Sequence, residues 1–396
     1  MRLWMMTLAV LFSCCHVSLA AAQTCDRHIK LGTTISETGP YSSMTARWAD
    51  LTREFFTQIN KDGGIYLSSC KRKVPVDIEI FDDQGNAATA VQLFEKMASN
   101  DNVDFFVGPD WTALGMPVSP IAEKHQIPIV MANIATEAAF ERGMKYMFAT
   151  PFPTIQNWST SYFQLLGSVN PKPKTIYFVT QDNPSQKAIA ETWAARAEAQ
   201  GIHVVGREIF PSSLKDFSST ILKVRAAHPD VIYVASYDFA SVPLIQQMRQ
   251  QHLNVMNIHV TDLTGTFLRQ LGHDAEGITG ELPWYPGMKG DYDSFVEGIV
   301  QKANIDLSQS TWTMSRIASY LVMVQAIEAA GAIDREKVRE VLATHTFKAP
   351  TGPIVFDKRG LAYKDGAYTS QVQDGKINVV WPEKLGKVRW PAVESK

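Results

Sequence analysis

Short apolar runs alternate with amphipathic stretches along the first part of the chain. The runs that predict β-strands are residues 29–34, 76–81, 103–107 and 127–131. Apolar residues spaced three and four positions apart predict a helix with one buried face at Trp48, Leu51, Phe55 and Ile59. Gly63-Gly64 is expected to end that helix, and Asn86 to cap the next one. A third helix is predicted around residues 118–124.

The same alternation restarts at residue 175. The predicted strands are residues 175–179, 204–209, 231–235 and 255–260, and the predicted helices are residues 187–200, 217–227 and 242–251. Strands that alternate with helices of about ten to fifteen residues are typical of βαβ units and parallel sheets. The chain is therefore predicted to be an α/β protein with two lobes, one for each series.

Three proline-bearing segments interrupt the pattern, at residues 148–153, 282–286 and 349–353. Between the last two, helices are predicted at residues 292–302, 312–331 and 335–343, and the tail predicts strands at 354–356 and 376–380 with a hairpin turn at Asp374-Gly375. Three breaks let a chain cross three times between two lobes, an arrangement suited to hinge motion. We predict lobe I at residues 23–149 and 284–349, and lobe II at residues 150–283 and 350–396.

The first 22 residues predict a secretory signal peptide. Arg2 precedes an uncharged apolar stretch, and small residues lead to Ala20-Ala21-Ala22. The stretch is shorter than the roughly 20 residues of a spanning helix, so we expect cleavage after Ala22 and export to the periplasm. An uncleaved membrane anchor and lipoprotein processing at Cys14 stay open as alternatives. No later run approaches membrane length, and stable membrane insertion of the mature chain is not expected.

Composition and charge add little to this pattern. The 396 residues carry a formal net charge of −2, and removal of Arg2 with the signal peptide leaves 37 basic residues against 40 acidic ones. Such a balance gives no electrostatic case for binding nucleic acid or an anionic membrane. Cys25 and Cys70 are the cysteines of the mature chain, and in an oxidising compartment they are expected to form one disulfide.

The motifs of common enzyme and metal sites are missing from the sequence. The missing motifs are H-E-x-x-H, C-x-x-C in the mature chain, G-x-S-x-G, G-x-x-x-x-G-K and, after the first strand, G-x-G-x-x-G. We therefore expect no metal and no cofactor, and the pattern favours a binding protein over an enzyme. In open α/β sheets, ligands bind in loops at the carboxyl ends of strands. Those loops are residues 36–45, 108–115, 131–137, 180–186, 236–238 and 261–264.

Several short motifs occur in an order that is fairly specific. They are Ser36-x-x-Gly39-Pro40, Asn60-x-x-Gly63-Gly64-Ile65, Asp82-Asp83-Gln84-Gly85-Asn86, Gly108, Ile127-Pro128-Ile129, Asp216-Phe217-Ser218, Pro229-Asp230, Trp284-Tyr285-Pro286 and Gly352-Pro353-Ile354-Val355-Phe356-Asp357. With them the chain resembles the periplasmic substrate-binding proteins of the branched-chain amino acid (Leu/Ile/Val) class of ABC transporters. The resemblance implies the type I periplasmic binding protein fold, in which two Rossmann-like lobes are joined by three hinge crossovers.

The resemblance also implies a set of ligand-binding residues. Thr112 and the loop of Asn133, Ala135 and Thr136 correspond to residues that hold a carboxylate, and Asp262 corresponds to the acid that meets an α-amino group. Tyr237 matches the aromatic residue near that acid, Met44 the position that faces the ligand side chain, and Trp284 the crossover aromatic. Trp111, beside Thr112, could stack on a ring or cap an aliphatic chain. The chain departs from the family at Thr45, where a glycine is usual, and at Pro184, where a tyrosine is usual.

The resemblance thus predicts a monomeric periplasmic receptor that captures an amino acid or a related carboxylate and delivers it to an inner-membrane ABC permease without chemistry. A sensory subunit of the same fold, which reports its ligand to a regulator or membrane receptor, stays open because it would have the same cleft. A secreted hydrolase built around His259 and Asp262 is the alternative from a different class.

Overall fold

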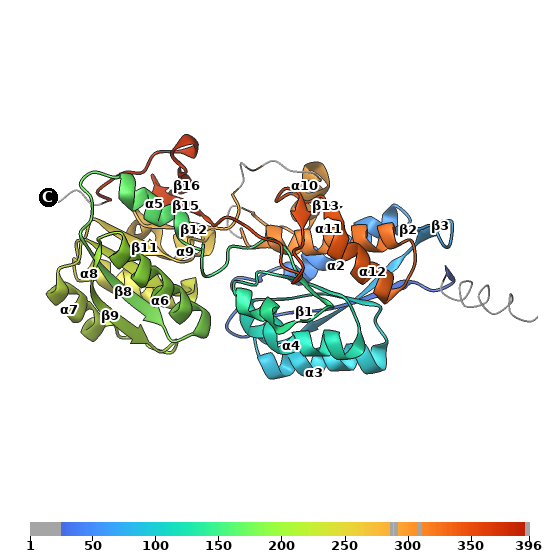
Figure 1. Ribbon diagram of the computed structural model, residues 1–396. Coiled ribbons are helices and arrows are strands. Elements are labelled where there is room, and N and C mark those ends of the chain that lie inside the picture. The colour runs from blue at the N-terminus through green and yellow to red at the C-terminus, as the bar shows by residue number, and fades with distance from the viewer. Residues whose placement is uncertain (1–24, 286–287, 289–291, 308–310, 393–396) are drawn as a thin grey trace, which may run out of the picture.

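The computed structural model describes residues 25–285, 288, 292–307 and 311–392. Two lobes lie side by side, and each draws on distant parts of the chain (Figure 1). The blue N-terminal segments share one lobe with the orange segments, whereas the green and yellow segments share the other with the red C-terminal strands. The predicted signal peptide, its cleavage point and Cys14 lie outside the described residues.

The first lobe is built on a parallel five-stranded sheet of order β4-β1-β5-β6-β7. Its strands are β1 (Ile29–Ile35), β4 (Val76–Asp82), β5 (Phe105–Asp110), β6 (Ile129–Ala132) and β7 (Met147–Ala149). The helices of this lobe are α2 (Trp48–Lys61), α3 (Ala87–Lys96), α4 (Thr112–His125), α10 (Asp293–Lys302), α11 (Thr313–Ala330) and α12 (Arg335–Thr344). The central strands β5 and β6 are buried along their whole length, which explains their continuous apolar runs.

The second lobe is built on a seven-stranded sheet of order β16-β15-β12-β11-β10-β8-β9. The parallel strands are β8 (Thr175–Gln181), β9 (His203–Phe210), β10 (Val231–Ala235), β11 (Asn257–Val260) and β12 (Thr279–Leu282). The antiparallel hairpin β15 (Tyr368–Gln373) and β16 (Lys376–Trp381) completes the sheet and turns at Asp374-Gly375, as predicted. The helices are α5 (Thr160–Ser168), α6 (Pro184–Ala199), α7 (Ser218–Ala227), α8 (Asp238–Gln250) and α9 (Gly265–Leu271).

Local signals in the sequence explain several element ends. The Asn86 side chain accepts hydrogen bonds from the backbone N–H groups of Ala88 and Thr89 and so caps α3. Gly63 and Gly64 follow α2 with φ angles of 95° and 96°, a region open mainly to glycine. Both predictions are confirmed.

Other elements were missed or shortened by the sequence analysis. The hairpin β2 (Ile65–Leu67) with β3 (Arg72–Val74), the strand β7 and the helix α5 were not predicted. The helix predicted around 118–124 begins six residues earlier, at Thr112. Pro117 and Pro120 lie inside it and interrupt the pattern by which a helix is recognised.

The two lobes are linked at three places. The first lies between β7 and α5, the second between β12 and α10, and the third between the pair β13 (Thr346–Phe347) and β14 (Ile354–Val355) and the strand β15. The lobe boundaries given above remain our proposed division of the chain.

The predicted disulfide is present, and it joins Cys25 to Cys70. It ties the residues that precede β1 to the turn of the β2–β3 hairpin. Among the described residues, no single helix has the length and hydropathy to cross a membrane. Only α11 and α12 taken together reach that threshold, as a pair bent by 113°.

Candidate ligand-binding site between the lobes

The loops at the carboxyl ends of the two sheets meet between the lobes. Tyr41, from the loop after β1, contacts Tyr237, from the loop after β10, edge to face with 5.8 Å between ring centroids. The backbone N–H of Ile155, in the first crossover, donates to the carbonyl of Ala135, 2.7 Å away, in the loop after β6. The predicted strand-end loops of both lobes therefore share one site.

Aromatic rings form most of one wall of this site. We call them the aromatic cluster, and its members are Tyr41, Trp48, Trp111, Phe152, Trp158, Tyr237 and Trp312. Trp111 stacks against Tyr41 at 5.7 Å and meets Trp312 at 5.5 Å between centroids. Trp312 in turn stacks against Trp158, at 5.8 Å. Trp111 belongs to the first lobe and Trp158 precedes α5 of the second, so Trp312 links rings from both lobes.

The first lobe presents Thr112 at the start of α4, directly after Trp111. The Thr112 hydroxyl oxygen accepts a 2.9 Å hydrogen bond from the backbone N–H of Ala135. This bond holds the loop after β6 against α4, and it leaves the hydroxyl proton of Thr112 free to donate to a ligand. Trp111 has a φ angle of 71°, a region that costs a bulky residue energy.

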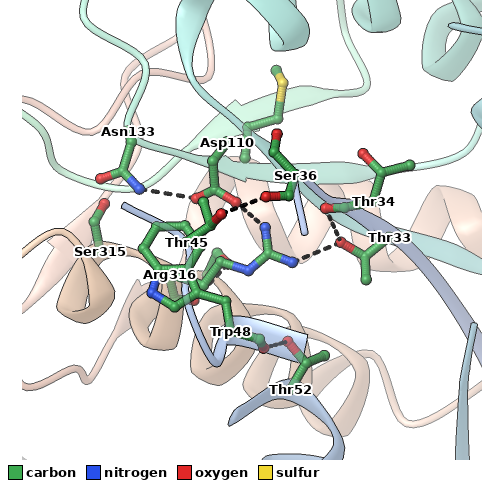
Figure 2. Close-up of polar contacts among 12 residues, drawn as sticks. Thr33, Thr34, Ser36, Thr45, Trp48, Thr52, Asp110, Asn133, Ser315 and Arg316 are labelled. Carbon is green, nitrogen blue, oxygen red and sulfur yellow. Dashed lines mark hydrogen bonds and ion pairs between the residues drawn. The ribbon is translucent and has the colours of Figure 1, made fainter. Parts of the chain in front are cut away.

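A buried ion pair between Asp110 and Arg316 lies next to this wall, since Asp110 directly precedes Trp111 in the chain (Figure 2). Arg316 on α11 pairs with Asp110 at the end of β5, and its guanidinium also donates to the Thr33 hydroxyl at 2.8 Å. The second carboxylate oxygen of Asp110 accepts a 2.9 Å bond from the side-chain amide of Asn133. Burial raises the pKa of Asp110 to about 6, and the charge and hydrogen bonds of Arg316 oppose a further rise. Asp110 is therefore ionised at pH 7, and it fixes the turn before Trp111 and the Asn133 side chain together.

The second lobe presents Asp262 immediately beyond β11. Its side chain is 1% exposed, and neither carboxyl oxygen has a hydrogen-bond partner within the described part of the chain. Burial raises the pKa of Asp262 well above its usual range, and the negative charge of Asp238 raises it further. An unpaired buried carboxylate is costly, and a ligand ammonium group is the partner that would compensate it.

A pocket of about 140 Å³ opens between the lobes beside Trp312. Its walls come from both sides of the site, and they are Ser43, Met44, Ala46, Arg47, Asp238, Thr264, Thr266, Arg269, Asn304, Ile305, Asp306 and Trp312. Met44, Asp238, Thr264 and Trp312 are its buried members. Asp238 and Trp312 each retain a polar atom without a hydrogen-bond partner among the described residues, namely Oδ1 of Asp238 and Nε1 of Trp312.

Most of the residues predicted from the sequence meet at this site. Met44 lines the pocket, Trp111 and Tyr237 belong to the aromatic cluster, and Thr112 and Ala135 are bonded to each other. Asn133 keeps its amide oxygen unpaired while its nitrogen binds Asp110, and Thr136 precedes the short 3₁₀ helix Glu137–Arg142. Asp262 is placed as described above. The Ala135 N–H is occupied by Thr112, so this N–H is not available to a ligand carboxylate.

Trp284 is placed differently from the other predicted residues. It packs in the core of the first lobe, in the cluster that contains Val296, Tyr320 and Phe356, rather than with the aromatic cluster. Its indole N–H has no partner among the described residues. We therefore leave Trp284 out of the proposed contact set.

Four residues of the site were not singled out as ligand-binding residues by the sequence analysis, namely Tyr41, Trp158, Asp238 and Trp312. Tyr41 and Asp238 do lie inside strand-end loops that it identified, residues 36–45 and 236–238. Nothing in those loops distinguished these two side chains from their neighbours. Trp312 lies at the start of a helix whose pattern is that of a core helix, so no local signal marks it.

His259, the residue considered for a hydrolase, lies inside the second lobe. Its ring stacks on Tyr162 with 3.6 Å between centroids, and its Nδ1 lies 3.0 Å from the Thr279 hydroxyl. Its Nε2 lies 3.4 Å from Oε1 of Glu281. Burial lowers the pKa of His259 and raises that of Glu281. The structure thus pairs His259 with Glu281 rather than with Asp262, and no nucleophile–base–acid arrangement is formed by them.

The Thr279 hydroxyl fixes where the protons of this pair lie. It donates to Oδ1 of Asn257 at 2.6 Å, so it must accept from Nδ1–H of His259. The remaining nitrogen, Nε2, is then an acceptor in the neutral imidazole, and among the described residues it makes no hydrogen bond, although Oε1 of Glu281 lies 3.4 Å away. Over the described residues, no group of three or more His, Cys, Asp or Glu side chains could hold a metal ion.

Comparison with known proteins agrees with this architecture. A family model described as periplasmic binding protein matches residues 28–376. The chain is 26% identical over 335 residues to the leucine-, isoleucine-, valine-, threonine- and alanine-binding protein of Pseudomonas aeruginosa, covering 82% of this chain and 86% of that protein. It is 25% identical over 343 residues to the Leu/Ile/Val-binding protein BraC3 of Rhizobium johnstonii, covering 85% and 89%.

Solved structures show the same fold. The chain superposes on the branched-chain amino acid transporter substrate-binding protein LivJ of Streptococcus pneumoniae, in complex with isoleucine, with a TM-score of 0.77. The two are 20% identical, and the match covers 89% of this chain and 98% of the other. For the leucine-binding protein LivK of Thermotoga maritima the TM-score is 0.76 at 20% identity, with coverage of 90% and 100%. The two-lobed α/β fold predicted from the sequence is thereby confirmed.

Proposed function

The chain belongs to the periplasmic binding protein family, and from this premise we propose that it is the solute-binding component of an ABC transporter for an amino acid or a related small carboxylate. The solute is held between the lobes and passed to a permease in the inner membrane. The protein reaches the periplasm through its cleaved signal peptide, acts there as a monomer and carries out no chemistry on the solute.

The unpaired carboxylate of Asp262 is the observation that carries this proposal. It lies 1% exposed between the lobes with both oxygens unpartnered among the described residues, which suits an α-ammonium group. The opposite wall offers the Thr112 hydroxyl proton and the start of α4, where helix N–H groups favour a carboxylate. Relatives from Pseudomonas aeruginosa and Rhizobium johnstonii are named for binding aliphatic amino acids, in line with such a ligand.

Isothermal titration calorimetry with ligand-free protein tests the proposal. The panel holds the twenty amino acids together with small organic acids, and at least one amino acid is expected to bind. The variant Asp262→Asn should weaken that binding by roughly 2–5 kcal/mol, because it removes the charge partner of a buried ammonium. Unchanged affinity in this variant removes Asp262 from the site. Folded protein that binds no member of the panel overturns the proposed ligand class.

A further inference from the structure

One carboxyl oxygen of Asp238 makes no hydrogen bond among the described residues. Asp238 is the first residue of α8 and is 2% exposed. Its Oδ2 accepts a 2.9 Å bond from the hydroxyl of Thr264, the residue that caps α9. A role in joining the starts of these two helices accounts for Oδ2. It does not account for Oδ1, which has no hydrogen-bond partner among the residues described, and a buried acceptor left unpaired is destabilising.

The interlobe pocket gives Oδ1 a place to find its partner. Asp238 lines this pocket from the second lobe, while Met44 and Trp312 line it from the opposite side. Trp312 is 3% exposed, and its indole N–H is also unpartnered within the described ranges. Two buried polar side chains thus keep unused hydrogen-bonding atoms at one pocket, so the pocket is built to receive a polar group.

The charge around this pocket decides which polar group fits. No ion pair joins Asp238 or Asp262 to a lysine, arginine or histidine among the described residues, and the negative charge of Asp238 helps to raise the pKa of Asp262. The cations and the third acid lie toward the rim. Arg269 bonds to the Thr266 hydroxyl, and Arg47 bonds to Asp50 and to the carbonyl of Ala303. Asp306 lines the same pocket and has a partner of its own.

Arg269, an exposed residue that lines the same pocket, is the protein cation whose charge acts on Asp238, but it forms no ion pair with either carboxylate. Two buried acids without an ion-pair partner among the described residues suit a ligand that supplies more than one positively charged or N–H-bearing group. A single α-ammonium group beside Asp262 satisfies one acid and leaves Oδ1 of Asp238 unpaired. The N–H groups of a side-chain ammonium or guanidinium can donate to Oδ1, and the faces of Trp312 and Tyr237 attract cations, whereas an aliphatic side chain leaves Oδ1 unpaired.

We propose that Asp238 is a second acidic contact of the site and that the solute is an amino acid whose side chain ends in an ammonium or guanidinium group. This inference rests on the proposed function and specifies the substrate class of the same site. The α-ammonium group lies against Asp262, and the side-chain cation reaches into the pocket that Asp238, Met44 and Trp312 line.

Norleucine and lysine provide the test, because they differ only by the terminal ammonium group of lysine. Both are titrated calorimetrically into the ligand-free protein, with ornithine, arginine and leucine alongside. Lysine, ornithine or arginine is expected to bind at least tenfold more tightly than norleucine or leucine. The variant Asp238→Asn should weaken the basic ligand at least tenfold and leave norleucine within about threefold. Asp262→Asn should weaken both classes.

The matched control is Asp374→Asn, which removes an exposed acid of the same lobe that pairs with Arg389 and should leave both affinities unchanged. Norleucine binding by Asp238→Asn shows that this variant is folded. If leucine or norleucine binds as tightly as every basic amino acid, the role of Asp238 is overturned while the proposed function stands. If Asp238→Asn weakens both classes equally, Asp238 is a structural residue. If no amino acid binds, the proposed function itself fails.

Discussion

Arg316 and Asp110 form an ion pair in the interior of the first lobe, although 206 positions separate them along the chain. Arg316 is fully buried, and its guanidinium also donates to Thr33 and Tyr320. The pair therefore joins α11 to β1 and β5, next to the turn that carries Trp111 and Thr112. It is a support of the ligand-binding wall rather than a part of its surface.

We expect Arg316→Met to lower the free energy of unfolding by about 3–5 kcal/mol, because it leaves the Asp110 carboxylate buried and unpaired. Urea denaturation followed by circular dichroism measures the loss. Arg53→Met is the control, since Arg53 pairs with Asp50 on the exposed surface and such pairs contribute at most about 1 kcal/mol. The double variant with Asp110→Asn should recover part of the loss. Equal stability of the two single variants would contradict the role of the buried pair.

The Cys25–Cys70 disulfide closes a loop of 45 residues. Such a crosslink stabilises mainly by restricting the unfolded chain, and its removal from a loop of this length costs roughly 3–5 kcal/mol. We expect the double variant Cys25→Ser/Cys70→Ser to unfold at a lower urea concentration than the natural chain. A reductant should shift the natural chain toward the variant and leave the variant itself unaffected. A variant as stable as the natural chain would contradict the stabilising role of this disulfide.

The sequence predicted those parts of the site that follow from local rules. The rule that ligands bind at strand ends in α/β sheets marked the loops that contain Asp262 and Tyr237, and the resemblance to Leu/Ile/Val-binding proteins singled out these two residues within them. Trp312 could not be found in this way, because its partners Trp111, Phe152 and Trp158 lie far away in the chain. Arg316 lies in a helix whose sequence pattern predicts an apolar core element. Only the three-dimensional fold shows that Asp110 faces this arginine.

Hydrogen-bond partners could likewise not be predicted from the sequence. The loop of residues 133–136 was expected to offer backbone N–H groups to a carboxylate, yet the Ala135 N–H is taken by Thr112. The three-dimensional contact between α4 and the loop after β6 decides this, and no residue type or spacing encodes it locally. The same holds for Glu281 and His259, which lie on neighbouring strands and pair only because β11 and β12 are adjacent.

Glu281 should make the stability of the protein depend on pH. Burial raises its pKa well above the usual range, whereas in the unfolded chain it ionises near its ordinary value of about 4.3. Above that value unfolding releases the proton, so the free energy of unfolding falls as the pH rises toward the raised pKa, by at most about 1.4 kcal/mol per pH unit. Glu281→Gln cannot ionise, and it keeps the size and shape of the side chain.

We therefore expect the stability difference between Glu281→Gln and the natural chain to grow in favour of the variant as the pH rises above the ordinary carboxyl pKa of about 4.3. Urea denaturation at a series of pH values measures it. His259 is present in both chains, so its own titration largely cancels in this difference. A difference that stays constant with pH would mean that Glu281 is ionised in the folded protein.

Thr112 is expected to affect both the position of the loop after β6 and the affinity for the ligand. Thr112→Val keeps the shape of the side chain but leaves the Ala135 N–H without its acceptor and removes the hydroxyl proton that faces the site. We expect it to weaken the ligand by about 10- to 100-fold, as the loss of one or two hydrogen bonds at 1–3 kcal/mol implies. Thr112→Ser retains the hydroxyl and should bind within about threefold of the natural chain. Calorimetric titration of both variants with the same amino acid measures the contrast, and equal affinities would show that the hydroxyl of Thr112 serves neither the loop nor the ligand.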